Sequence, residues 1–128
     1  MATRERQKAA TRNARPHKGV EAQARLKWLR MSPRKVRLVV DQVRNRKVGE
    51  ALHMLAASPK AAAKPVRKLL WSAVSNLEQD RERVDVENLR VVRAYVDEGA
   101  TWRRWLPRAM GRATRVRKHT SHVTIVVG

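Results

Sequence analysis

The segment that most restricts how this chain can fold is a cationic stretch from Gly99 to Lys118. It carries seven basic residues and no acidic one. On either side lie segments rich in valine, Leu89–Val96 and Val123–Val127, and this composition favours β-strands. Seven like charges cannot be buried together, and they repel one another unless an anionic partner surrounds them. The sequence therefore predicts a cationic arm between two strands that binds a polyanion, for which a nucleic acid is the best candidate.

Much of the remaining positive charge lies at the N-terminus. The chain has 128 residues, of which 30 are basic and 11 are acidic, and its net charge is +19. Residues 1–19 hold six basic residues against one acidic residue, Glu5, and show no hydrophobic periodicity. A chain of this length forms one domain with a modest core. We therefore expect residues 1–19 to be a basic, disordered extension, and residues 20–128 to be a single globular domain that includes an extended hairpin over residues 97–122.

The composition also disfavours several classes of protein. The chain has no cysteine, which excludes disulfides, thiolate metal sites and a cysteine nucleophile. No apolar run approaches the roughly 20 residues of a membrane helix, so we expect no membrane partner. The N-terminus lacks the apolar region of a secretory signal. An organelle transit peptide is harder to exclude because such segments are also rich in arginine, but Glu5 and the lack of an apolar helical face argue against one.

Hydrophobic periodicity predicts a strand followed by helices. Residues 21–31 alternate in character, and the side chains expected to face inward are Ala22, Ala24, Leu26 and Trp28. Ser32-Pro33 predicts a helix start, because a hydroxyl can cap free N–H groups and proline lacks a donor that is unused there. The apolar stripe of this first helix is Val36, Val39, Val40 and Val43, and that of a short second helix is Val48, Ala51, Leu52 and Leu55.

The same signal recurs at Ser58-Pro59, where it predicts the start of the longest helix. The apolar stripe of this helix is Ala62, Val66, Leu69, Leu70, Ala73, Val74 and Leu77. Pro65 would fall in its second turn, where proline destabilises or bends a helix. The predicted fold class is α+β, with three helices packed on a three-stranded antiparallel sheet and a long basic β-hairpin extending from the sheet.

The hairpin is expected to reach far from the domain. With a turn at residues 107–111, Asp97 lies roughly opposite Ser121, and the arm is about 35 Å long at about 3.3 Å per residue. This exceeds twice the radius of gyration of about 13 Å expected for a 100-residue domain. An isolated two-stranded ribbon is marginally stable in water, so this arm needs a partner.

The side chains of the arm suit RNA. Its arginines outnumber lysine six to one, and each can fork onto phosphate oxygens or stack on a base; they are Arg103, Arg104, Arg108, Arg112, Arg115 and Arg117. Trp102 and Trp105 can stack on unpaired bases. The alternatives are a solvated cationic face for the arginines, and packing on hairpin neighbours or on the edge of the domain for the tryptophans.

Two further clusters are candidate sites with simpler alternatives. Arg34, Lys35 and Arg37 lie near the start of the first helix, whose free N–H groups also favour phosphate, although a solvated helix face explains them as well. A second cluster could converge across the hairpin as a metal site or an acid–base pair, and consists of Asp97, Glu98, His119 and His122. Cross-strand pairing accounts for that cluster without chemistry, so we expect no catalytic residue, no metal and no cofactor.

Five strings of residues resemble the bacterial large-subunit ribosomal protein twenty-two family. They are MSPRKVRLVVDQVRNRKVGEAL (31–52), KLLWSAVSN (68–76), YVDEG (95–99), PRAMGRA (107–113) and TSHVTIVV (120–127). They occur in the order and spacing of the family, over residues 22–128. The resemblance implies a structural constituent of the large ribosomal subunit, located in the cytoplasm, that binds large-subunit rRNA, pins several rRNA domains during assembly and catalyses nothing. It also implies neighbouring large-subunit ribosomal proteins as partners.

The resemblance further implies a hairpin tip that lines the nascent-peptide exit tunnel and contacts the nascent polypeptide, near the macrolide-binding region but with no small-molecule substrate of its own. The tunnel-lining candidates are Trp102, Arg103, Arg104 and Met110. The rRNA-binding candidates are Arg34, Lys35, Arg37, Arg103, Arg104, Arg108, Arg112, Arg115, Arg117, Lys118, His119 and His122.

The chain departs from the family pattern at a few positions. Asn45 stands where the family usually has glycine after the first helix, and we expect the turn to survive because asparagine tolerates a left-handed backbone. Met110 replaces a residue at the tip that is typically polar or basic, and Trp102 and Trp105 are bulkier than usual. Met110 brings no charge to its position, so we expect no electrostatic role there, and we expect the bulkier tryptophans to change the shape of the exit tunnel where the hairpin lines it.

Two other functions remain as alternatives. An architectural DNA-binding protein can also use long basic hairpins, but such proteins form intertwined dimers, whereas this pattern describes a self-sufficient monomer. A metal-dependent nuclease would use the acidic and histidine cluster at the base of the hairpin.

Overall fold

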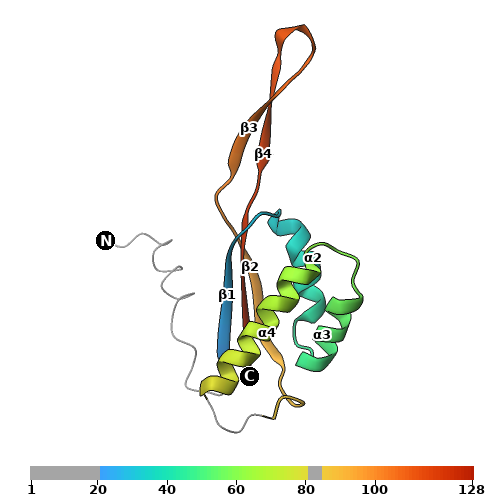
Figure 1. The fold of residues 1–128 in the computed structure, drawn as a ribbon, viewed down its shortest axis with the longest axis vertical. Coiled ribbons are helices and arrows are strands. Elements are labelled where there is room, and N and C mark those ends of the chain that lie inside the picture. Colours follow the sequence, from blue (N-terminus) through green and yellow to red (C-terminus); the bar gives the residue numbers. More distant parts are fainter. Residues whose placement is uncertain (1–20, 81–84) are drawn as a thin grey trace, which may run out of the picture.

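A three-stranded antiparallel sheet forms the centre of the globular part of the protein (Figure 1). The computed structural model describes residues 21–80 and 85–128, so the predicted extension over residues 1–19 lies outside the described residues. The strands of the sheet are β1 (Ala22–Leu29), β2 (Val91–Glu98) and β5 (Ser121–Val127). β5 lies between the other two and pairs antiparallel with both.

Three helices complete the globular part, and together with the sheet they confirm the predicted α+β fold. They are α2 (Pro33–Val43), α3 (Val48–Ala57) and α4 (Ala63–Asp80). α2 packs against β2, α4 packs against β1 and β5, and α3 packs against α4. In the described part of the chain, no helix is both long enough and apolar enough to span a membrane.

The apolar stripes predicted for the helices form the core. All four valines of the first stripe are fully buried, and so are most of the apolar residues of α4. The stripes of α2 and α4 meet the inward residues of the central strand, of which Val123, Ile125 and Val127 are fully buried. Burial of these side chains is the main force that holds the helices on the sheet.

The inward alternation predicted for β1 is correct at Ala22, Ala24 and Leu26 but wrong at Trp28. The Trp28 side chain is 60% exposed, and its backbone has a φ of 61°. The ladder between β1 and β5 shifts register between Leu26 and Leu29, and Leu29 packs against the core in place of the tryptophan. A β-bulge accommodates one extra residue, so it reverses the inside-outside alternation that follows it.

The two Ser-Pro signals have different outcomes. α2 begins at Pro33 as predicted, although Ser32 makes no side-chain cap and instead accepts a hydrogen bond from the Lys35 N–H through its backbone carbonyl (3.1 Å). Ser58 instead ends α3, where its N–H donates to the Met54 carbonyl (3.0 Å), and α4 begins at Ala63. The prediction that Ser58-Pro59 starts the longest helix is therefore wrong.

The later start of α4 also changes the role of Pro65. This residue lies in the first turn of the helix rather than in the second. The first turn contains N–H groups that have no acceptor within the helix, so the missing donor of proline costs little there. The expected bend has no cause once the boundary is correct.

The cationic arm forms a separate two-stranded antiparallel sheet that we call the β3–β4 ribbon. It consists of β3 (Trp102–Pro107), β4 (Ala113–Lys118) and a short 3₁₀ turn, η1 (Ala109–Gly111), between them. Figure 1 shows the ribbon extending away from the domain along the long axis of the molecule. Below it, Asp97 pairs with His122 and Glu98 with Ser121, one residue from the predicted register.

Candidate nucleic-acid interface

Almost the whole surface of the β3–β4 ribbon is open to solvent. Every residue of β3 and η1 is exposed, and in β4 only Val116 is half-buried. All seven basic residues predicted for the arm are therefore on the surface. An element with no buried face obtains little stability from the hydrophobic effect.

The pairing of the two strands places like charges next to each other. Arg103 lies directly opposite Arg117 in the ladder, and Trp102 lies opposite Lys118. Like charges at directly opposed positions destabilise a ribbon. An anion bound along the ribbon removes this repulsion, so the arrangement is suited to a polyanionic ligand.

Both tryptophans of the ribbon contact arginine guanidinium groups. The Trp102 ring lies 5.4 Å from the Arg30 guanidinium carbon and 5.5 Å from that of Arg104, and the Trp105 ring lies 5.1 Å from that of Arg115. These are cation–π distances. Trp102 remains 47% exposed and Trp105 63% exposed, so each ring contacts hairpin or domain neighbours, as the alternative for the tryptophans anticipated, and still presents a surface on which a base can stack.

The tip of the ribbon presents a large apolar side chain to solvent. Met110 is 93% exposed and has a φ of 61°, and Gly111 follows with a φ of 67°. The Arg108 N–H donates to the Arg112 carbonyl (2.8 Å) and closes the turn. The turn thus points Met110 outward at the end of the ribbon that is farthest from the domain.

The base of the ribbon is held by a close contact between Gly99 and Thr120. The Gly99 N–H donates to the Thr120 carbonyl (2.9 Å), and the buried Thr120 hydroxyl donates to the Ala100 carbonyl (2.6 Å). A side chain at Gly99 would collide with Thr120 Oγ1 and lie 3.2 Å from His122 Nε2. Glycine is therefore required here for the close approach of the two chains, and this contact connects the ribbon to the sheet.

The acidic and histidine cluster at this base has structural contacts and does not converge on one point. Glu98 Oε1 lies 3.6 Å from His119 Nδ1. His122 Nδ1 accepts a hydrogen bond from the backbone N–H of Trp28 (3.0 Å). The His122 and Trp28 rings also contact edge to face, with their centroids 5.0 Å apart. Over residues 21–80 and 85–128, no three histidine or acidic side chains are grouped so that they could hold a metal ion. The geometry therefore gives no support to the nuclease alternative.

Comparison with known proteins assigns the fold and the ribbon to one family. A model of the family described as "Ribosomal protein L22p/L17e" matches residues 24–128. The chain belongs to this family. The large ribosomal subunit protein uL22 of Anaeromyxobacter sp. (strain K) is 56% identical over 105 residues, which cover 82% of this chain and 72% of the relative.

Two further L22p/L17e relatives differ in how much of this chain they align with. The large ribosomal subunit protein uL22 of Anaeromyxobacter sp. (strain Fw109-5) is 49% identical over 131 residues, and the alignment covers 99% of this chain and 91% of the relative. The protein of the same name from Maridesulfovibrio salexigens is 53% identical over 108 residues, which cover 84% of this chain and 97% of the relative. The alignment with the first of these relatives therefore includes the basic N-terminal segment.

The turn after α2 keeps its backbone conformation although asparagine stands where L22p/L17e proteins usually have glycine, as expected from the sequence. Asn45 has a φ of 63°, which is the left-handed region that glycine favours and asparagine tolerates. Its N–H donates to the Val91 carbonyl (3.0 Å). The turn is preserved, and this hydrogen bond holds it against β2.

The basic residues predicted on α2 have different surroundings. Arg34 and Lys35 are exposed on the surface of the helix. Arg37 donates from Nη2 to the Val96 carbonyl (3.2 Å) and so helps to hold α2 on β2. Arg34 and Lys35 have the freedom to contact a ligand, whereas Arg37 also has a structural role.

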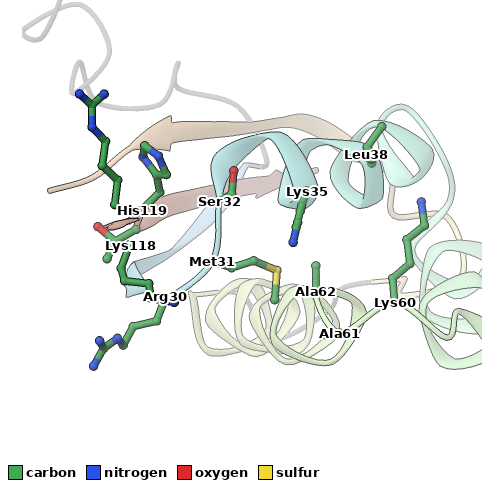
Figure 2. A pocket seen from close by; sticks show the side chains of 12 residues that line it. Arg30, Met31, Ser32, Lys35, Leu38, Lys60, Ala61, Ala62, Lys118 and His119 are labelled. Atoms are coloured by element: carbon green, nitrogen blue, oxygen red, sulfur yellow. The ribbon is translucent and has the colours of Figure 1, made fainter. Parts of the chain in front are cut away.

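Lys35 lines a cavity of about 630 Å³ together with residues from the base of the ribbon. Figure 2 shows Lys35 above Met31 and Ala62, with Lys118 and His119 at one end of the cavity. Two further cations of this cavity, Arg30 and Lys60, are absent from the residues predicted from sequence. Arg30 lies in the segment between β1 and α2 and Lys60 in the segment between α3 and α4, and the fold brings them together.

Proposed function

We propose that the β3–β4 ribbon and the adjoining surface of α2 bind large-subunit rRNA and pin several of its domains during assembly. As a member of the L22p/L17e family, the chain is a structural constituent of the large ribosomal subunit and not an enzyme. The observation that carries the rRNA-binding proposal is a ribbon with seven exposed basic residues, no acidic one and no buried face of its own. Such a ribbon is stabilised when phosphates surround it.

The proposed rRNA contacts follow the exposed cations. Arg103, Arg108 and Arg115 are examples from three heights along the ribbon. Each guanidinium can bind phosphate oxygens in a bidentate manner. The other proposed contacts are Arg34, Lys35, Arg37, Arg104, Arg112, Arg117, Lys118, His119 and His122, of which Arg37 and His122 also make hydrogen bonds within the domain.

We also propose that the ribbon lines the nascent-peptide exit tunnel. Met110 lies at the tip, whereas Trp102, Arg103 and Arg104 belong to the end of the ladder nearest the domain. The four proposed tunnel residues therefore lie at two heights along the ribbon, and only Met110 is at its tip. A nascent chain would pass Met110 and the Trp102–Arg104 segment in succession.

Neighbouring large-subunit proteins are the other proposed partners, and the protein works in the cytoplasm within the ribosome. We propose residues 1–19, with six basic residues, as an additional rRNA-binding extension of the globular domain. Macrolides that bind close to the tip would be affected by changes at Met110 without being ligands of the protein.

Fractionation of a cell lysate on a sucrose gradient, before and after a high-salt wash, tests this function. We expect the protein to sediment with the large subunit and to remain bound to it after the high-salt wash. A ribbon surrounded by rRNA can dissociate only if the surrounding rRNA unfolds. A position at the top of the gradient would contradict the proposal. Sedimentation with nucleoid DNA would favour the architectural DNA-binding alternative, for which gel filtration should reveal a dimer.

A further inference from the structure

The cavity at the base of the β3–β4 ribbon is lined by both apolar and basic side chains, and phosphate binding alone does not explain this combination. Its volume is about 630 Å³, within the range of about 300–1,000 Å³ of pockets that hold a small molecule. It lies between the end of β1, α2, the segment that leads into α4, and the end of β4. We call it the basal pocket. Its size is suited to a compact chemical group and not to a duplex.

The floor of the basal pocket is apolar. It contains the half-buried side chain of Met31 and the exposed side chain of Leu38, together with Ala61 and Ala62. Leu38 is 59% exposed even though it belongs to a helix with a well-buried stripe. The leucine and methionine side chains that line this pocket provide flexible apolar surface that can lie against a planar group.

Cations lie at both ends of this floor. They are Arg30, Lys35, Lys60, Arg117 and Lys118, and none of the described residues that line the pocket is acidic. In Figure 2, Lys60 is at one end, Arg30 and Lys118 are at the other, and Met31 and Ala62 lie between them. Within the part of the chain that the structure describes, none of these five cations is in a salt bridge. Their charges are therefore available to a ligand.

We propose that the basal pocket binds one unpaired nucleotide of the rRNA, turned out of its helix, with the base on the apolar floor and its two flanking phosphates on the cations at the ends. The proposal rests on the proposed function, since it names a specific ligand within the rRNA interface. RNA-binding proteins commonly recognise such nucleotides by contact with the face of the base together with contacts to phosphate.

Three observations favour a nucleotide over other occupants. An isolated phosphate would leave the apolar floor unused, and an apolar molecule would leave five cations unneutralised. An acidic segment of a neighbouring protein is the remaining competitor. Arg117 and Lys118 belong both to the pocket and to the β3–β4 ribbon, and Arg30 also stacks on Trp102, so the pocket is continuous with the proposed rRNA surface. This continuity favours RNA.

Binding of the full-length protein to transcribed large-subunit rRNA, measured over a range of salt concentrations, tests the pocket. Leu38→Ser should weaken binding by about fivefold, the effect of roughly one lost apolar contact, and should leave the salt dependence unchanged. Lys35→Gln should weaken binding and also lower the slope of log K against log salt by about 0.7–0.9, because one phosphate contact is lost. Val92→Ser removes an exposed apolar side chain on β2 and serves as the matched control.

The outcomes separate this proposal from the proposed function. If the unmodified protein shows no salt-dependent binding, the rRNA-binding function itself fails. If it binds but Leu38→Ser behaves like Val92→Ser, the basal pocket is not a nucleotide site while the function stands. Thermal unfolding of each variant shows whether a loss of affinity reflects a loss of folding, and the exposure of Leu38 makes folding of its variant the expected result.

A crosslink from the pocket identifies its occupant directly. A photoreactive benzoylphenylalanine placed at position 38, in large subunits assembled in cells, should crosslink to a single rRNA nucleotide that is unpaired in the secondary structure of the rRNA. The same group at position 92 should not give this crosslink. A crosslink to a ribosomal protein, or one spread over a paired helix, would overturn the proposal.

Discussion

The globular domain and the β3–β4 ribbon place similar side chains in opposite environments. Leu70 on α4 and Ile125 on β5 are fully buried, whereas Leu106 is 43% exposed and Met110 is 93% exposed. In the domain, arginines make specific contacts with the backbone, as Arg44 does by donating to the Ala94 carbonyl (2.9 Å). On the ribbon, arginines lie opposite one another or over tryptophan rings.

The difference indicates that the two regions have different sources of stability. The domain is held by its own apolar core, which requires no partner. The ribbon has a backbone ladder but no buried face, and its charges oppose its formation until anions neutralise them. Stability of the domain and affinity for rRNA should therefore respond to different substitutions.

The strongest test compares the same substitution in the two regions. Leu70→Ala should lower the free energy of unfolding by about 2–5 kcal/mol, because it creates a cavity in the core. Leu106→Ala should change it by less than about 0.5 kcal/mol, because that side chain is exposed. Urea unfolding measures both values, and similar losses for the two variants would show that the ribbon packs against its own domain.

Replacing three arginines of the ribbon by uncharged residues should weaken rRNA binding and leave the free energy of unfolding nearly unchanged. The triple variant Arg108→Gln, Arg112→Gln and Arg115→Gln should bind transcribed large-subunit rRNA about 100-fold more weakly, with a salt slope smaller by about 2–3, because three phosphate contacts are lost. Its unfolding free energy should stay within about 0.5 kcal/mol of the original.

The control for this variant changes the charge of the protein by the same amount. Lys64, Arg67 and Lys68 are exposed on α4, and their replacement by glutamine should have a much smaller effect on binding. Equal effects of the two triple variants would mean that net charge, and not the ribbon, determines the affinity.

The junction between the two regions is tested at Gly99. Gly99→Ala should destabilise the protein by about 1–3 kcal/mol, because the new methyl group collides with Thr120 Oγ1. Thr120→Ala removes that oxygen and costs about 1–3 kcal/mol by itself, because the Ala100 carbonyl loses its hydrogen bond.

The double variant distinguishes a direct contact from two independent effects. Because Thr120→Ala removes the atom with which the methyl group collides, the double variant should lose less stability than the sum of the single variants. Additive losses in urea unfolding would show that the close approach at Gly99 does not depend on Thr120.

The smallest expected effect concerns the opposed arginines of the ribbon. Arg117→Glu places a carboxylate opposite Arg103 and should stabilise the free ribbon by about 0.2–1 kcal/mol. Amide hydrogen exchange in the ribbon of the free protein should become slower, whereas binding to rRNA should become weaker. Arg117→Gln should give an intermediate exchange rate, and faster exchange in the glutamate variant would contradict the proposed repulsion.

The sequence was sufficient to predict the core and the arm because both depend on local patterns. The valines of α2 and the stripe of α4 repeat at the spacing of a helix face. The cationic arm was evident from composition alone. These features are fixed by residues that are close together in the chain.

The features that could not be predicted depend on contacts between distant segments. Trp28 faces outward because a bulge against β5 shifts the register of β1, and the strand itself gives no sign of the bulge. The Ser-Pro signal is identical at Ser32 and Ser58, but the second serine follows a helix that already continues to Ala57. The basal pocket joins Arg30, Lys60 and Arg117 from three separate parts of the chain.

The central position of β5 has a consequence for synthesis of the protein. β5 follows every other element in chain order, yet β1 and β2 pair with it and not with each other. Because a chain emerges from its N-terminus onward, both outer strands and the whole ribbon are made before the sheet can form. Until then, the unpaired strands are potential templates for aggregation, so a growing copy depends on being kept apart from other copies until its last strand arrives.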